Sequence, residues 1–158
     1  MKKSLVIMLL LTVSTLIWAG LPSFQLKDIN GNTVDSGSLT NNGKPIVVSF
    51  FTTWCKPCMR ELAAINDAYP DWQDELGVKV VLISVDQAQD VQKVKPLLDG
   101  NAWDFDCLLD PNGDLQRALA IQSIPYSMVL DAKGEIVYKH VGYTDGDEDE
   151  LYKFLKGL

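Results

Sequence analysis

The chain has 158 residues, which is the usual length of one domain. Its 14 lysines and arginines are outnumbered by 21 aspartates and glutamates, which gives a net charge of −7. Proteins that bind nucleic acid or an anionic membrane surface carry clustered positive charge, which such an acidic chain does not offer. We therefore expect neither partner, and we interpret the acidity as a source of solubility.

The first 20 residues have the pattern of a secretory signal peptide. Two lysines follow the initiating methionine, an apolar run extends from Leu5 to Ile17, and the small residues Ala19 and Gly20 come next. We predict a leader over residues 1–20 that is cleaved after export to the periplasm or an equivalent space. The apolar run is shorter than the roughly 20 residues that span a bilayer comfortably. An uncleaved leader that tethers the protein to the inner membrane is the alternative.

The remaining residues, 21–158, are enough for one ordinary hydrophobic core. Loss of the leader removes two lysines and no acidic residue, so the mature chain has 12 basic and 21 acidic side chains and a net charge of −9. No repeat, low-complexity tract or linker divides this part of the sequence. We therefore expect a single domain.

The first half of this domain contains two short extended pieces, one long apolar strand and one helix. The apolar run Pro45–Phe51 is dense in β-branched and aromatic residues and predicts a buried strand. A helix is predicted from Cys58 to about Glu75, and Pro70 is expected to end or kink it. The short extended pieces are expected at residues 24–26 and 33–34.

The second half alternates predicted strands and helices. Asp114 is expected to cap a short helix that ends near Ala120, and Pro96 is expected to disturb the helix that contains it. This order predicts an α/β sheet with helices on both faces. The expected strands are 78–85, 105–109, 127–130 and 136–141, and the expected helices are 87–98, 114–120 and 147–158.

Three cysteines are present, Cys55, Cys58 and Cys107. An odd number leaves one thiol over in any framework of structural disulfides. Cys55 and Cys58 would close a very short loop, which removes little entropy from the unfolded chain. We therefore interpret this pair as reactive, and Cys107 as a small buried core residue.

The pair follows a predicted strand and opens a predicted helix. Unpaired backbone N–H groups at a helix N-terminus favour an anion and lower the pKa of a cysteine placed there. Cys55 is therefore the predicted nucleophile, which attacks a disulfide of the substrate as a thiolate. Cys58 is three residues further on and would resolve the mixed disulfide. Pro57 suits an early helical position because no N–H group is needed there.

The sequence lacks the further residues that a zinc site or a haem attachment site at this cysteine pair would require. A zinc site requires about four ligands, but the chain has no second CxxC and one histidine, His140. A c-type haem requires a histidine directly after the second cysteine, where this chain has Met59. We expect neither a metal nor a cofactor, and we assign His140 no function.

The segment Val47–Glu61 (VVSFFTTWCKPCMRE) resembles the active-site strand, turn and helix of TlpA/ResA-like thioredoxins. The resemblance extends from about Pro22 to the last helix and includes an Ile-Pro pair before a late strand. It implies a thioredoxin fold, in which helices flank a central mixed β-sheet, with a short N-terminal β extension. It also implies reduction of disulfides in client proteins, with a membrane thiol–disulfide carrier as electron donor.

The resemblance also implies roles for four further residues. Ile124 and Pro125 would form a substrate platform that faces the cysteines, with Pro125 in the cis form. Glu61, one helical turn after Cys58, would assist proton transfer to and from the resolving thiol. Trp54 would belong to an exposed contact surface. Independently of the resemblance, Gly142 either lets the backbone of a substrate approach or simply ends a strand.

Two other functions remain open at this stage. A peroxiredoxin-like peroxidase would use the same fold, but Phe51–Cys55 lacks the proline expected upstream of a peroxidatic cysteine. A copper metallochaperone would use both cysteines as soft ligands, with a companion such as Met59, whose side chain we expect to point into the core. We expect the protein to act as a monomer.

Overall fold

The computed structural model describes residues 20–158, which include all of the domain predicted at 21–158. The predicted leader lies, apart from Gly20, outside the described residues. Within residues 20–158, no helix is both long enough and apolar enough to cross a membrane.

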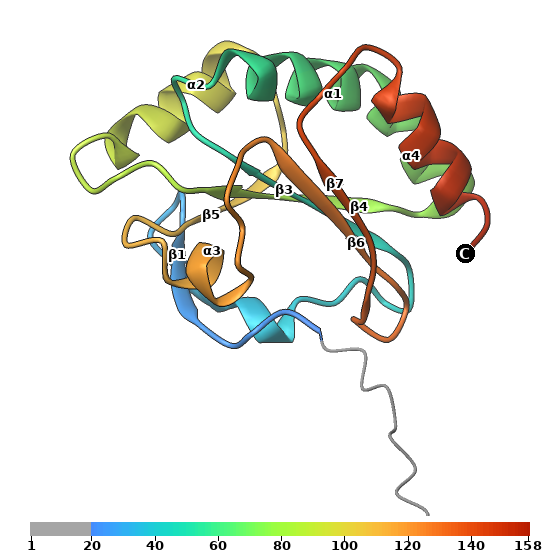
Figure 1. The fold of residues 1–158 in the computed structure, drawn as a ribbon, viewed down its shortest axis with the longest axis horizontal. Coiled ribbons are helices and arrows are strands. Elements are labelled where there is room, and N and C mark those ends of the chain that lie inside the picture. The colour runs from blue at the N-terminus through green and yellow to red at the C-terminus, as the bar shows by residue number, and fades with distance from the viewer. Residues whose placement is uncertain (1–19) are drawn as a thin grey trace, which may run out of the picture.

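A seven-stranded sheet runs through the centre of the domain (Figure 1). Its spatial order is β2-β1-β5-β4-β3-β6-β7, so the central strand β4 has β5 and β3 as parallel neighbours and every other pair is antiparallel. The predicted mixed sheet and its short N-terminal extension, the hairpin of β1 and β2, are confirmed. The strands are β1 (Gln25–Asp28), β2 (Thr33–Asp35), β3 (Ile46–Phe51), β4 (Lys79–Ser84), β5 (Asp106–Leu109), β6 (Tyr126–Leu130) and β7 (Ile136–Val141).

The sheet separates two hydrophobic cores. Strand β3 is buried along its whole length, and its side chains alternate between the two faces. Val47 and Phe51 belong to one core, whereas Ile46, Val48 and Phe50 belong to the other. A strand that is covered on both faces reads as a continuous apolar run, which explains why β3 could be predicted from composition.

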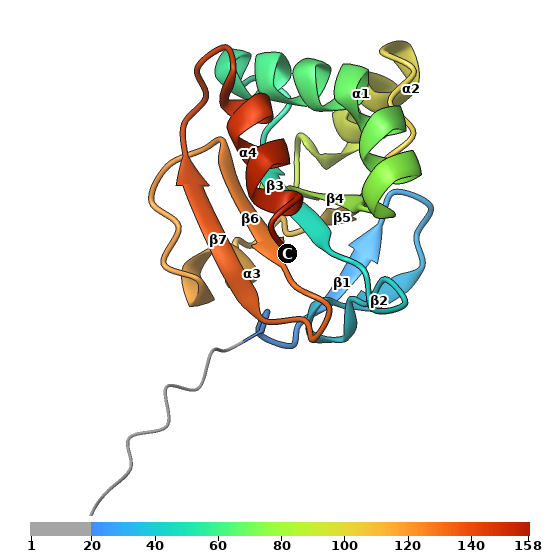
Figure 2. The same ribbon diagram turned by 90° about the vertical axis from the view of Figure 1, so that its right-hand side faces the viewer.

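Helices cover both faces, as predicted. Figures 1 and 2 show α1 (Lys56–Leu76), α2 (Val94–Gly100) and α4 (Asp147–Leu155) on one side of the sheet, and the short α3 (Asp114–Ala118) on the other. The N-terminal segment helps to cover the second face, where Leu21 and Leu26 join the core. The 3-10 helices η1 (Ser36–Ser38) and η2 (Val91–Lys93) complete the elements of the described residues.

Helix α1 ends close to the predicted position at Glu75, but it does not end at Pro70, which was one of the two expected effects of this proline. The helix continues to Leu76, and Gly77 then adopts a left-handed conformation with φ +64° and donates from its N–H group to the Gln73 carbonyl. Trp72, in the turn after Pro70, is buried and stacks on Tyr152 of α4. Burial of this large side chain offsets the hydrogen bond that Pro70 cannot make.

Two shorter helices also differ from the prediction. The expected helix 87–98 is divided into η2 and α2, and Pro96 lies in the first turn of α2, where its missing N–H group costs nothing. Helix α3 begins as expected at Asp114, but the capping carboxylate belongs to Asp110. It accepts hydrogen bonds from the amides of Asp114 and Gln116, at 2.8 and 2.9 Å.

Candidate active site

The two reactive cysteines lie where strand β3 passes into helix α1. Cys55 is the N-cap of α1, with extended backbone angles, and its Sγ atom accepts a hydrogen bond of 3.3 Å from the amide of Cys58. Cys55 and Cys58 form a disulfide, and their Cα atoms are 5.3 Å apart. Cys55 therefore lies where it was predicted, at the N-terminus of a 21-residue helix, which is the positive end of the helix dipole. This position is the one that the sequence prediction requires for a nucleophilic Cys55.

Hydrogen bonds to Asp86 stabilise the turn before Cys55. The sequence analysis did not identify this residue. Asp86 follows β4 and is fully buried. Its carboxylate accepts hydrogen bonds from the Thr53 amide at 3.1 and 2.9 Å, from the Thr53 hydroxyl at 2.8 Å and from the Ser84 hydroxyl at 2.9 Å. The buried charge is thus compensated, and it holds the backbone two residues before Cys55.

Glu61 is buried one turn after Cys58, on the face of α1 that packs against the sheet. One carboxylate oxygen accepts a hydrogen bond of 2.7 Å from the hydroxyl of Ser49 on β3, and the other accepts from the hydroxyl of Ser127 on β6. The two serines are directly opposite each other in the antiparallel pairing of β3 and β6. Glu61 is therefore anchored between α1 and two neighbouring strands.

The pKa of the Glu61 carboxyl is raised above its ordinary value. Burial is the main cause, because it disfavours the charged form, and the hydrogen bonds from Ser127 and Ser49 oppose the shift. A carboxyl with a raised pKa binds a proton more readily than an ordinary carboxyl, which suits a proton acceptor. The position beside the helical turn of Cys58 agrees with the role implied by resemblance.

The expected platform residues meet at the same end of the sheet. The Ile124–Pro125 peptide bond is cis. Because Phe50 of β3 pairs with Tyr126 of β6, Pro125 lies next to the end of β3 from which the cysteine turn departs. Gly142 lies beside Pro125, since its amide donates a hydrogen bond of 2.8 Å to the Pro125 carbonyl.

Trp54 is the most exposed large apolar side chain of the described residues, at 72%. It directly precedes Cys55, so exposed apolar surface adjoins the disulfide as expected. Val141, which directly precedes Gly142, is also exposed. Ile124, in contrast, is only half-exposed and packs against both cores. The residues expected to bind substrate therefore gather at one end of the sheet, but only Trp54 among them projects strongly into solvent.

His140, to which the sequence assigned no function, has a defined partner. Its Nε2 atom is 3.0 Å from the Oδ2 atom of Asp147, the first residue of α4. Histidine and aspartate seven residues apart and separated by a turn give no local signal in the sequence, so this contact could not be predicted. Cys107 is buried in the core as predicted, and burial raises the pKa of its thiol to about 12.

No metal-binding cluster is found in the part of the chain that the structure describes, where no three histidine, cysteine, aspartate or glutamate side chains are grouped around a common point. A CxxC disulfide at the N-terminus of a long helix, beside a cis-proline at the start of a neighbouring strand, defines a thiol–disulfide oxidoreductase with a thioredoxin fold.

Comparison with known proteins agrees with this class. Residues 19–139 match the model of the AhpC/TSA family, so the chain belongs to this family. It is 33% identical over 120 residues to sporulation thiol-disulfide oxidoreductase A of Bacillus subtilis, which covers 75% of this chain and 70% of the relative. It is 25% identical over 137 residues to thiol-disulfide oxidoreductase ResA of Bacillus thuringiensis, with 87% and 75% of the two chains covered. The resemblance to TlpA/ResA-like thioredoxins is thereby confirmed.

The fold also matches solved structures. An uncharacterised thioredoxin-like protein from Porphyromonas gingivalis superposes with a TM-score of 0.80 at 52% identity, over 89% of this chain and 92% of that chain. StoA from Bacillus subtilis superposes with a TM-score of 0.66 at 29% identity, over 85% and 98%. The predicted thioredoxin fold and the enzyme class are therefore both established.

Proposed function

We propose that this enzyme is exported and reduces disulfides of client proteins through the dithiol of Cys55 and Cys58. The observation that carries the proposal is the position of Cys55 at the N-terminus of α1, next to the exposed side chain of Trp54. A nucleophilic thiolate beside an apolar contact surface suits a macromolecular substrate better than a small polar one.

The reaction begins with the Cys55 thiolate, which attacks one sulfur of the client disulfide. The S–S bond of the client breaks, one client sulfur leaves as a thiolate and takes up a proton, and the other sulfur is joined to Cys55 as a mixed disulfide. The exposed surface at Trp54 and the backbone at Ile124, Pro125 and Gly142 hold the client segment during this step.

The second step releases the client. Cys58 gives its proton to Glu61, and the resulting thiolate attacks the Sγ atom of Cys55. The Cys55–Cys58 disulfide forms, and the second client sulfur leaves and is protonated. The client has then gained two electrons and two protons, and the enzyme has lost two electrons. A membrane thiol–disulfide carrier restores the dithiol.

Trapping of the mixed disulfide tests the mechanism. In the Cys58→Ser variant the first step still proceeds and the second cannot, so a disulfide-linked adduct through Cys55 should accumulate with a model protein disulfide. The matched control is Cys107→Ala, which retains both active-site thiols and should turn over normally. Absence of any thiol-dependent adduct, with reductase activity absent from the wild type, would contradict the proposal.

The direction of electron flow requires a separate measurement. Thiol–disulfide exchange proteins span about −270 to −120 mV, and the Lys56-Pro57 dipeptide does not determine where this couple lies. We expect the Cys55–Cys58 couple to be on the reducing side of this range. A potential near −120 mV would instead indicate an oxidase or isomerase, and a peroxide-consumption assay would identify a peroxidase.

Export rests on the leader pattern of residues 1–20. Fractionation of cells that express the full chain, followed by N-terminal sequencing, should recover the mature protein outside the cytoplasm with a new terminus near Ala19 or Gly20. An unprocessed chain in the inner membrane would indicate the tethered alternative. Recovery in the cytoplasm with an intact N-terminus would contradict export.

A further inference from the structure

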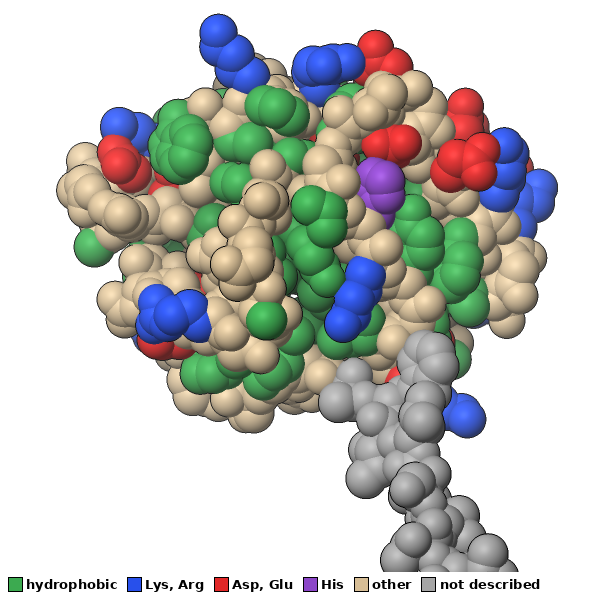
Figure 3. Space-filling model, viewed as in Figure 1, with side chains coloured by type: hydrophobic (Ala, Val, Ile, Leu, Met, Phe, Trp, Pro, Cys, Tyr) green, Lys and Arg blue, Asp and Glu red, His purple; other side chains and the backbone are tan. Residues whose placement is uncertain are grey.

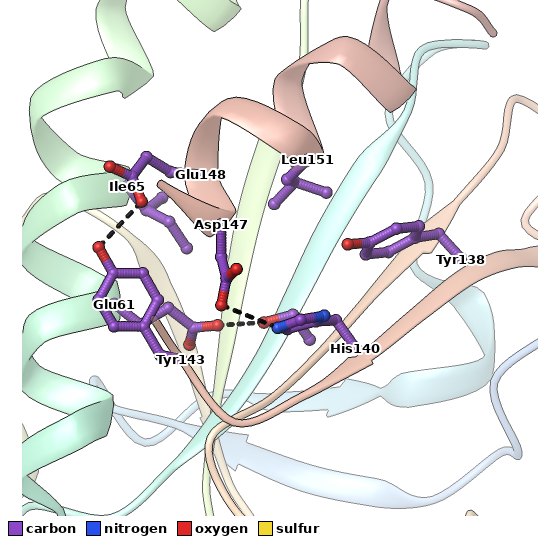
Figure 4. A pocket seen from close by; sticks show the side chains of 9 residues that line it. Glu61, Ile65, Tyr138, His140, Tyr143, Asp147, Glu148 and Leu151 are labelled. Carbon is purple, nitrogen blue, oxygen red and sulfur yellow. Dashed lines mark hydrogen bonds and ion pairs between the residues drawn. The ribbon is translucent and has the colours of Figure 1, made fainter. Parts of the chain in front are cut away.

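A small cavity lies between α1, β7 and α4, beside the carboxylate of Glu61 (Figure 4). Its volume is about 10 Å³, which is close to the space that one water molecule requires. Both polar and apolar side chains line it, and the apolar ones include Ile65 and Leu151. The polar side chains that line the cavity are Glu61, Ser127, His140, Tyr143, Asp147 and Glu148.

Glu61 forms the buried end of this cavity. Its side chain is almost fully buried, and both oxygens already accept hydrogen bonds from Ser49 and Ser127 on the sheet side. A proton that Glu61 receives can return to Cys58 when the enzyme is reduced again, or it can exchange with solvent in the interval. The cavity adjoins this carboxyl on the side that faces β7 and α4.

His140 forms the outer end. The pairing of β6 with β7 places His140 directly opposite Ser127, which is the residue that hydrogen-bonds Glu61. The side chain of His140 is 35% exposed, and Figure 3 shows the single histidine of the chain at the surface beside carboxylate groups. In Figure 4 the Glu61 carboxylate and the His140 ring extend from α1 and β7 toward the same space.

Asp147 fixes the orientation of the imidazole. Its Oδ2 atom contacts His140 Nε2 at 3.0 Å and also accepts a hydrogen bond of 2.7 Å from the Thr144 amide at the start of α4. A carboxylate that is itself held by a backbone amide gives the ring one preferred position. Because Nε2 is engaged with Asp147, Nδ1 is the other ring nitrogen through which His140 can exchange a proton.

Charged and titratable side chains from α1, β7, the β7–α4 turn and α4 surround this cavity. The Tyr143 hydroxyl donates to Glu148, at 2.9 Å, so this carboxylate is already engaged. Arg60 of α1 lies over the Tyr143 ring and pairs with Asp145 on the outer surface. The groups that face His140 or line the cavity with it are Glu61 of α1, Tyr138 of β7, Tyr143 of the β7–α4 turn, and Asp147 and Glu148 of α4.

We propose that His140, oriented by Asp147, exchanges the proton of Glu61 with solvent through a water molecule in this cavity. This inference rests on the proposed function, because it concerns the proton that Cys58 releases. The Glu61 carboxyl passes its proton to the water, the water passes one to the imidazole, and the imidazolium releases one to bulk solvent. The same path runs in reverse when the enzyme is reduced and Cys58 is protonated again.

A small aromatic disulfide with chromogenic thiol leaving groups separates the two chemical steps. The reduced enzyme releases the first chromogenic thiol when Cys55 attacks and the second when Cys58 resolves the mixed disulfide. In His140→Ala we expect the first release to be unchanged and the second to slow by about tenfold at neutral pH, since general acid–base assistance is typically worth about 10²–10⁴-fold and cavity water retains part of it. Added imidazole should restore the second rate, because it occupies the space of the deleted ring.

Two further variants keep the test decisive. Asp147→Asn should slow the second release less than His140→Ala and shift its pH profile, and His140→Gln replaces the alanine variant if that protein does not fold. Lys139→Ala is the matched control, because the neighbouring side chain on β7 is exposed on the opposite face and should leave both rates unchanged.

A second release that is as fast in His140→Ala as in the wild type would overturn the inference. So would a slower release that imidazole does not restore, because that result indicates a purely structural clamp between β7 and α4. Failure of the proposed function gives a different result. In that case the wild-type enzyme itself would release no second thiol, or Cys58→Ser would release it at the wild-type rate.

Discussion

The Glu61 carboxyl is a buried acid that accepts hydrogen bonds from two neutral serine hydroxyls. Burial raises its pKa in the folded state above the value in the unfolded chain. The folded state therefore binds this proton more tightly. The resulting stabilisation is fully present below the unfolded pKa and is lost as the pH rises through the folded pKa.

Glu61→Gln should consequently stabilise the protein at neutral pH, because the neutral amide removes the cost of burying a negative charge. The gain should vanish in acid, where the wild-type carboxyl is protonated as well. Urea unfolding of the oxidised protein at several pH values measures this difference. Asp74→Asn, an exposed site on the same helix, is the control, and a variant less stable than the wild type at neutral pH would contradict the assignment.

Asp86 performs a different task, because its buried charge is fully compensated by Thr53 and Ser84. Asp86→Ala should lower the free energy of unfolding by about 2–4 kcal/mol, since it leaves a buried amide and hydroxyls without acceptors. The turn before Cys55 would also lose its anchor, so the rate of Cys55 attack should fall. Chemical unfolding and the first thiol release measure the two effects, with the exposed Asp104→Ala as control.

These residues differ in how well the sequence could identify them. Cys55 and Cys58 are identified by their spacing at the start of a predicted helix, whereas Glu61 is identified chiefly by the family resemblance. Asp86 contacts a residue 33 positions away, and His140 acts with Asp147 across a turn. Contacts of this kind depend on strand order and register, which the sequence of one chain does not reveal.

At the scale of elements, helix α1 tolerates a proline in its interior. The nitrogen of Pro70 cannot donate to the Asn66 carbonyl, and a proline at such a position costs about 3 kcal/mol. Proline also lowers the conformational entropy of the unfolded chain, and this effect stabilises the folded state by up to about 1 kcal/mol. The second half of the helix survives because Trp72 is buried against Tyr152 of α4.

Pro70→Ala should therefore stabilise the protein by about 1–2 kcal/mol and leave thiol exchange unchanged, because the site is several turns away from the cysteines. Urea unfolding measures the gain, and the two thiol releases verify the activity. Ala63→Ser, another exposed position on the same helix, controls for surface substitution. A loss of stability would mean that Pro70 makes a favourable contact that the helical geometry does not suggest.

Strands were easier to predict than helix ends. The buried strands β3 and β4 are continuous apolar runs, which their double-sided burial requires. Helix ends depend on caps, and the cap of α3 comes from Asp110 in the preceding turn and not from Asp114 within the helix. Local propensity identifies that a helix exists, whereas the particular capping side chain depends on the folded turn.

At the scale of the whole molecule, the two cores on either face of the sheet depend on each other through the central strands. Cys107 of β5 lies in the core beneath α1, α2 and α4, where it is 2% exposed. In the oxidised protein Cys55 and Cys58 are bonded to each other, so Cys107 is the single free thiol of the chain. Its accessibility therefore reports on the opening of the entire core.

Alkylation of Cys107 in the oxidised protein should accordingly require global unfolding. Burial removes access to the sulfur and raises the pKa of the thiol to about 12, so the reactive thiolate is scarce in the native state. A domain stable by about 5 kcal/mol or more should be labelled at least about 10³-fold more slowly than the unfolded chain. The rate should rise with urea with a slope equal to that of equilibrium unfolding, as measured by mass spectrometry. Labelling that is insensitive to urea would instead reveal a local opening at β5, and the two halves of the sheet would then not unfold as one cooperative unit.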